Sequence, residues 1–145
     1  MPRLNDPFNT PIEDDGAFET RRHFVTWTDK PDDDNARDTL DYLGMITGKK
    51  NGKRIVDDLV NGKSSVFKAK DILRASLLAP LPREDTHVKV ALQLIAEGKA
   101  LQPVYLIRGR IKNGVPLVIV DGYHRISAAF HTDPGTDISA FITRA

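Results

Sequence analysis

The residues best suited to chemistry lie near the end of the chain, where an apolar run at 118–120 is followed by Asp-Gly-Tyr-His-Arg at 121–125. The apolar run predicts a strand, and residues 123–130 predict a short helix. A strand that turns through glycine into a helix leaves backbone N–H groups without partners at the helix start, and these groups attract anions. The segment therefore predicts a phosphate site.

The first turn of this expected helix carries His124 and Arg125. Cations near a helix start oppose the helix dipole, and a bound phosphate would reverse that penalty. Arg125 can hold two phosphate oxygens at once, His124 can donate a hydrogen bond or move a proton, and Gly122 lets a ligand approach the backbone closely. In the alternative interpretation, Arg125 pairs with Asp121 and His124 is an ordinary surface residue.

Three further pieces precede this segment: Pro-Arg-Glu at 82–84, a helix ending in Ile-Ala-Glu-Gly at 95–98, and Leu-Gln-Pro-Val at 101–104. Together with the segment at 121–129, their order resembles that of the ParB/sulfiredoxin superfamily, over roughly residues 66–145. The resemblance implies a compact α+β domain with a small mixed sheet flanked by helices. It also implies binding of a nucleoside triphosphate, ATP or CTP, together with Mg²⁺.

The same resemblance implies roles for particular residues. The positions that would hold phosphate or line the nucleotide pocket are Arg83, Gln102, Pro103, Gly122, Tyr123, His124 and Arg125. Sulfiredoxin activity is excluded, because Tyr123 stands where sulfiredoxins carry their cysteine and this chain has no cysteine. Partition proteins of the superfamily continue into a helix-turn-helix DNA reader, which residues 1–145 lack, so we do not expect site-specific partition.

ParB proteins bind and hydrolyse CTP and clamp DNA, and other members of the superfamily are ATPases, nucleases or free-serine kinases. We therefore expect a ParB-like protein that binds a nucleoside triphosphate with Mg²⁺ and hydrolyses it. Such a protein would act on DNA, as a nuclease or a DNA-binding accessory, or be regulated by DNA. The alternatives are a non-catalytic nucleotide- or DNA-binding module and a phosphotransferase that acts on a small hydroxyl metabolite.

Hydrolysis or transfer of a phosphoryl group needs Mg²⁺ and a carboxylate that orients the attacking group. The catalytic candidates are Glu84, Asp121 and His124, with Mg²⁺ held by Glu84 or Asp85. Two of these carboxylates have a structural alternative: Asp121 as a helix cap, and Glu84 as a first-turn residue that complements the helix dipole.

The four histidines, His23, His87, His124 and His131, show no spacing typical of a metal site along the chain. His124 and His131 are seven residues apart, and two histidines two helical turns apart rarely form a site. We therefore expect no metal held by histidines. The absence of cysteine also excludes disulfides, thiolate zinc sites and iron–sulfur clusters.

Charge is distributed unevenly along the chain although the net charge is only +1. Residues 1–48 carry 11 acidic against 5 basic side chains, whereas residues 49–83 carry 9 basic against 3 acidic ones. Such a basic block can contact the phosphates of DNA. The candidate contacts are Lys49, Lys50, Lys53 and Arg54. A flexible, solubilising loop is the alternative for this stretch.

Hydrophobic periodicity and turn residues place the elements that must position these groups. We expect helices within 33–45, 55–60, 71–78, 86–97 and 123–130, and strands at 23–28, 66–67, 103–107, 115–120 and 138–142. Turns are expected at 48–53 and 112–114. The resulting fold is α+β, with an N-terminal extension at 1–64, partly irregular with short helices, and a ParB/sulfiredoxin-like domain at 65–145.

The length of 145 residues, with 40% hydrophobic and 28% charged residues, is typical of one globular domain. The sequence has no apolar run of the roughly 20 residues that a membrane span requires, and its N-terminus does not resemble a signal peptide. We therefore expect a cytoplasmic protein without membrane contact. The oligomeric state stays open, with a homodimer among the options.

Overall fold

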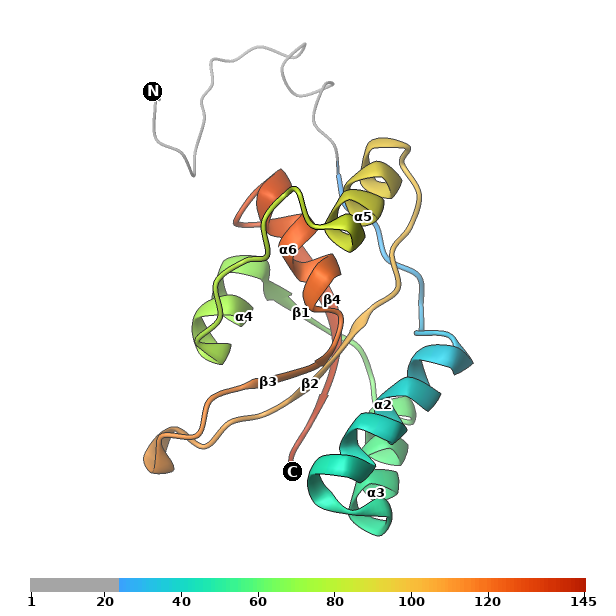
Figure 1. The fold of residues 1–145 in the computed structure, drawn as a ribbon, viewed down its shortest axis with the longest axis vertical. Helices are drawn as coiled ribbons and strands as arrows, with labels where there is room; N and C mark the ends of the chain where they lie inside the picture. The colour runs from blue at the N-terminus through green and yellow to red at the C-terminus, as the bar shows by residue number, and fades with distance from the viewer. Residues whose placement is uncertain (1–23) are drawn as a thin grey trace.

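A mixed sheet lies at the centre of residues 24–145, the part of the chain that the computed structural model describes (Figure 1). Its strands are β1 (Ser65–Lys68), β2 (Val104–Ile107), β3 (Val118–Asp121) and β4 (Asp137–Thr143). They follow the order β1-β4-β2-β3, in which β2 and β4 are parallel and the outer pairs are antiparallel. Helices flank this sheet, which confirms the predicted α+β class.

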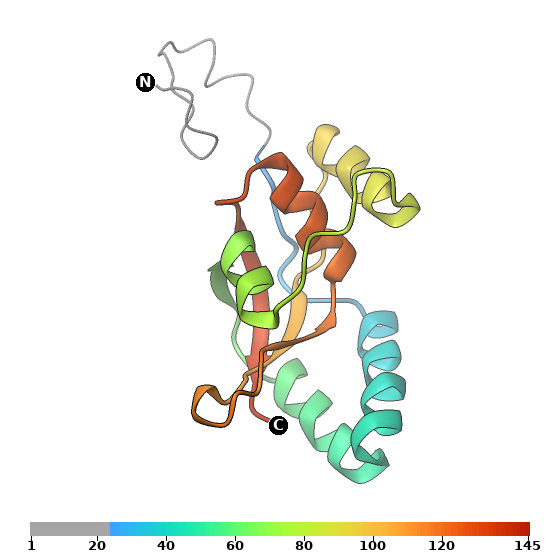
Figure 2. The same cartoon turned by 60° about the vertical axis from the view of Figure 1, so that its left-hand side comes forward.

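One face of the sheet is covered by α4 (Ala69–Ser76) and α6 (Tyr123–Thr132) (Figure 2). Alternate residues of β2 point to this side, because successive side chains of a strand face opposite ways. The buried cluster formed there contains Ala69, Ile72, Leu73, Val104, Leu106, Ile126, Ala129, Ile138 and Ala140.

The opposite face is covered by a pair of helices, α2 (Asp33–Thr47) and α3 (Lys49–Val60). Their buried cluster with β2 and β4 contains Leu43, Ile55, Val56, Leu59, Tyr105, Ile107 and Phe141. Residues 33–60, which lie in the extension expected at 1–64, thus share a hydrophobic core with the sheet. Among the described residues, no helix is long and apolar enough to cross a bilayer.

A further helix, α5 (Thr86–Ala96), packs on α6. Its apolar side supplies Val88, Ala91 and Ile95 to a cluster with Leu101 and Ala128. The contact places the start of α5 beside the start of α6, which decides the layout of the candidate site.

The turn predicted at 48–53 is wrong, because α3 already begins at Lys49 and only Gly48 forms the corner. Gly52 was interpreted as a turn former, but it lies buried within the helix. A Cβ atom at Gly52 would come within 3.0 Å of the backbone nitrogen of Gly44. The glycine therefore lets α3 approach α2 closely, a function that a local pattern cannot distinguish from a turn. The loop alternative for the basic stretch fails for the same reason.

Two strand predictions were too long. The strand expected at 23–28 is reduced, within the described residues, to a single bridge between Trp27 and Leu101; His23 lies outside those residues. The strand expected from Val115 begins only at Val118, because Pro116 has no N–H to contribute to the ladder. The turn before it is a short 3₁₀ helix, Ile111–Asn113, that ends at Gly114.

Candidate functional site

The connection between β3 and α6 is a tight turn through Gly122, whose φ of 112° is accessible mainly to glycine. A Cβ atom here would lie 2.3 Å from Cγ1 of Val104 on the neighbouring strand, so the turn is pressed against the sheet. No side chain of the described residues caps α6 at this end. The first-turn N–H groups of α6 therefore remain without a side-chain partner, as the sequence predicted.

A pocket of about 350 Å³ opens beside this turn. Its polar lining includes His87 and these residues predicted from the sequence: Gln102, Asp121, Gly122, His124 and Arg125. They come from the entry to β2, the end of β3 and the start of α6, and α5 adds an apolar wall. The fold thus brings together residues that are more than twenty positions apart in the sequence.

The guanidinium of Arg125 is already engaged by a neighbouring carboxylate. Its Nη2 donates to Oδ2 of Asp121 at 2.9 Å, and the two side chains are only 18% and 26% exposed. This is the pairing that the alternative interpretation of Arg125 describes. Arginine has five N–H donors, so this bond occupies part of its capacity, and an anion in the pocket would share Arg125 with Asp121.

Gln102 connects the pocket to the start of α2. Its Oε1 accepts hydrogen bonds from the backbone N–H of Asp32, at 2.9 Å, and from Nδ2 of Asn35, while its Nε2 donates to Oδ2 of Asp32 at 2.8 Å. The pKa of Asp32 is lowered, first by the hydrogen bond from the backbone of Asn35 and then by that from Gln102. Attraction to Arg125 is the smallest cause of the same shift.

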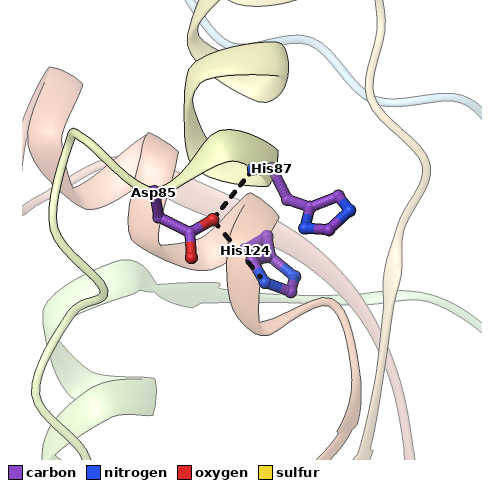
Figure 3. A group of neighbouring side chains, drawn as sticks. All are labelled: Asp85, His87 and His124. Atoms are coloured by element: carbon purple, nitrogen blue, oxygen red, sulfur yellow. Dashed lines mark hydrogen bonds and ion pairs between the residues drawn. The ribbon is translucent and has the colours of Figure 1, made fainter.

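A group of ionisable side chains lies where α5 meets α6 (Figure 3). Oδ1 of Asp85 caps α5 by accepting hydrogen bonds from the backbone N–H groups of His87, at 2.9 Å, and Val88, at 3.0 Å. The same oxygen lies 3.8 Å from Nε2 of His124. These hydrogen bonds, above all that from Val88, lower the pKa of Asp85, and the two imidazoles add to the effect.

The rings of His87 and His124 are neighbours, with centroids 4.8 Å apart. One ligand atom from each of Asp85, His87 and His124 can be chosen so that all lie within 4.8 Å of one another. Spacing along the chain did not reveal this group, because the histidines belong to different helices and meet only through the packing of α5 on α6. From the sequence, all four histidines were considered, but only His131 was compared with His124 as a partner, and His87 was not.

Several other predicted residues lie away from the pocket. Arg83 donates through Nη2 to the carbonyl of His131, 2.9 Å away, near the end of α6. The hydroxyl of Tyr123 donates to the carbonyl of Ala79. Pro103 is fully buried and Glu84 is exposed. Within residues 24–145, none of Arg83, Glu84, Pro103 and Tyr123 is part of the pocket lining.

The basic residues of the middle block lie in the first turns of α3, which follows the end of α2, whereas the start of α2 contacts Gln102 of the pocket lining. Figure 1 shows the start of α3 at the far end of α2 from the start of α6. Lys53 pairs with Asp57 and Arg54 with Asp58, each at 3.0 Å, while Lys49 and Lys50 occupy the first turn of α3. The α2 helix has 15 residues, which at 1.5 Å each separate its two ends by about 22 Å. The basic surface and the pocket are therefore distinct sites.

Comparisons of the chain with protein-family models, with curated proteins and with solved structures found no match. The site is therefore characterised by its own chemistry. It consists of an uncapped helix start with an arginine and a histidine, walled by Gln102 and α5, next to a group of one aspartate and two histidines.

Proposed function

We propose that the protein binds a nucleoside triphosphate with Mg²⁺, ATP or CTP, in the pocket at the start of α6 and hydrolyses it. The observation that carries the proposal is the lining of one pocket by the turn at Gly122 and the side chains of His124 and Arg125. Its volume of about 350 Å³ falls in the range of small-molecule sites. The resemblance of residues 66–145 to the ParB/sulfiredoxin superfamily supports the nucleotide class.

In this proposal, the first-turn N–H groups of α6 and the guanidinium of Arg125 hold the phosphates. Asp121 faces the pocket beside Arg125, so its carboxylate fits a hard cation such as Mg²⁺ better than the exposed Glu84 does. Mg²⁺ at this carboxylate would offset the charge of the phosphates. Binding would thus divide the ion pair, with Arg125 on phosphate and Asp121 on the cation.

Hydrolysis requires water to attack the terminal phosphorus while its bond to the bridging oxygen breaks, which yields a nucleoside diphosphate and inorganic phosphate. The imidazole of His124 is 46% exposed at the pocket and can take the proton that the water loses. His124 is the residue that we assign to this step.

A non-catalytic nucleotide-binding module is the second candidate, and the ion pair favours it. Asp121 is committed to Arg125 at 2.9 Å, and Glu84 lies outside the pocket lining, so neither carboxylate is aimed at an attacking water. A His124→Gln variant separates the two candidates. For an enzyme, phosphate release falls by about 100-fold or more while the nucleotide still binds. For a module, the intact protein releases no phosphate above background.

Calorimetric titration of the full chain with ATP, CTP and GTP in the presence of Mg²⁺ tests binding itself. Arg125→Gln removes the guanidinium, and we expect it to weaken nucleotide binding about tenfold or more. Arg54→Gln is the matched control, because Arg54 also pairs with an aspartate one helical turn away; it should change binding less than about twofold. Thermal unfolding of both variants verifies that they fold.

Three results would overturn the proposal. The first is no binding by the intact chain at millimolar nucleotide. The second is an equal loss in Arg125→Gln and Arg54→Gln, which would mean that nucleotide responds to overall charge. A loss confined to Arg54→Gln would instead assign polyanion binding to α3, where Lys49 and Lys50 are the proposed DNA contacts together with Lys53 and Arg54.

A further inference from the structure

The group at the junction of α5 and α6 has a chemistry that nucleotide binding does not require. We propose that Asp85, His87 and His124 form a site for a divalent transition-metal ion of the Zn²⁺ or Co²⁺ type. Binding of this ion needs no nucleotide. The two proposals share His124, because an imidazole that holds the ion cannot at the same time take the proton of the attacking water.

The positions of the three side chains suit a single ion. Ligand atoms about 2.0–2.2 Å from a tetrahedral Zn²⁺ lie about 3.4 Å from one another. Here one set of ligand atoms already lies within 4.8 Å, so closing on an ion requires shifts of about 1.4 Å or less per pair. His87 and His124 are exposed, and rotation of their side chains can supply this movement without a change in the backbone.

The carboxylate is held in place by the fold. Oδ1 of Asp85 accepts both hydrogen bonds from the backbone N–H groups at the start of α5. These two bonds fix the orientation of the side chain. The same oxygen faces Nε2 of His124 at 3.8 Å, so Oδ1 is the ligand atom that the fold presents to an ion (Figure 3). A ligand that is already ordered by such bonds loses little conformational freedom on binding.

The identity of the donors selects the class of metal. Two imidazole nitrogens and one carboxylate oxygen suit Zn²⁺, Co²⁺ or Ni²⁺, whereas Mg²⁺ and Ca²⁺ prefer oxygen donors alone. Three protein ligands leave at least one position open on the ion. His87 and His124 also line the pocket, so an ion held by them would lie beside the space where a ligand would bind.

An ordinary interpretation explains the same proximity without metal: His124 in its protonated form would pair with Asp85 at 3.8 Å, and its ring would contact that of His87, which is tilted by 54° to it. The two interpretations differ in one measurable property. An ion pair needs a charged His124, whereas a metal site binds a cation stoichiometrically and depends on His87 as much as on His124.

Titration of the full chain with Co²⁺, without nucleotide, distinguishes them. We expect one Co²⁺ per chain with the visible absorption of a tetrahedral site, and its displacement by Zn²⁺. The ligand variants are His87→Gln, His124→Gln and Asp85→Asn, of which the last keeps a side chain able to cap α5. Each should weaken Co²⁺ binding about tenfold or more. His23→Gln and His131→Gln are the controls and should change it less than about twofold.

The proposal is overturned if the intact chain binds no Co²⁺ at millimolar concentration, or if the ligand variants bind it as the intact chain does. Circular dichroism of each variant establishes that its helices are retained. Asp85→Asn also separates this proposal from the proposed function, because Asp85 is not part of the pocket lining. It should bind Co²⁺ about tenfold or more weakly and still bind nucleotide with Mg²⁺ within about twofold of the intact chain, so failure of either proposal is visible without the other.

Discussion

The helices α3 and α6 begin in nearly the same way. Each follows a glycine with positive φ, 89° at Gly48 and 112° at Gly122, and among the described residues neither start has a side-chain cap. Each carries basic side chains in its first turn, Lys49 and Lys50 in α3 and His124 with Arg125 in α6. By local chemistry alone, both starts are equally suited to an anion.

Their surroundings differ. A Cβ atom at Gly48 would meet nothing within 4 Å in the described part of the chain, whereas one at Gly122 would collide with Val104. The cations of α3 are exposed, but Arg125 is 18% exposed and lines a pocket. An uncapped helix start therefore becomes a candidate site only where neighbouring strands and helices form a pocket around it.

The largest effect that we expect from this comparison concerns the two glycines. Gly122→Ala combines an unfavourable φ with overpacking against Val104 and should lower the free energy of unfolding by about 3 kcal/mol or more. Gly48→Ala has the φ cost alone and should lower it by about 1–2 kcal/mol. Chemical denaturation of both variants measures the difference. Equal losses would mean that Val104 moves aside freely and that the turn into α6 is not tightly packed.

The sequence predicted the fold class and most helices, since their apolar stripes and stops are local. It failed at Gly52, where the glycine serves a contact with α2 that no local pattern encodes. The strand from Val115 was overextended because the run of apolar residues outweighed Pro116. Long-range packing decides the first case, and the missing N–H of Pro116 decides the second.

In the candidate site, too, local features were predictable from the sequence and contacts between distant elements were not. The turn at 121–125 was recognisable because a strand, a glycine and a helix are consecutive in the chain. His87 approaches His124 because α5 packs on α6. Asp32 approaches Gln102 because α2 packs against the sheet. Neither contact leaves a signal in the spacing of residues. The pairing of Arg125 with Asp121 was one of two alternatives that only the structure separates.

A smaller effect, on the pH dependence of stability, is expected at the start of α2, which has a side-chain cap where α3 and α6 have none. Hydrogen bonds from Asn35 and Gln102 hold the pKa of Asp32 below its ordinary value of 3.8. A carboxyl whose pKa is lower in the folded state stabilises the protein fully above its unfolded pKa, and this contribution is lost as the pH falls through the folded value. We therefore expect stability to decline below about pH 4, in part because Asp32 becomes protonated.

Thermal unfolding between pH 2 and pH 7 measures this contribution. Asp32→Asn should unfold at a lower temperature than the intact chain near neutral pH, and the two should converge in acid. Asp33→Asn is the control. It removes a neighbouring carboxylate, but the capping hydrogen bond from the backbone N–H of Asn35 goes to Asp32 and is left in place. If Asp32→Asn and Asp33→Asn follow the same curve, the cap on α2 does not contribute to acid sensitivity.

The smallest effect is expected in the coupling between arginine and aspartate one helical turn apart. The ion pairs have nearly equal distances, 2.9 Å for Arg125–Asp121 and 3.0 Å for Arg54–Asp58. Their exposure differs: the side chains are 18% and 26% exposed in the Arg125 pair and 48% each in the Arg54 pair. Solvent screens the exposed pair more strongly, so a double-mutant cycle should give a coupling energy of about 1 kcal/mol for Arg125–Asp121 and about 0.4 kcal/mol for Arg54–Asp58.

The four variants of each cycle replace arginine by glutamine and aspartate by asparagine, with unfolding followed in urea at low and at high salt. High salt should reduce the coupling of the Arg54 pair toward zero and leave most of that of the Arg125 pair, because the pocket excludes part of the ionic atmosphere. A coupling of Arg125 to Asp121 no larger than that of the exposed pair would show that Asp121 holds the guanidinium only weakly. An incoming phosphate would then face little competition for Arg125, and the start of α6 would resemble that of α3 more closely than its packing indicates.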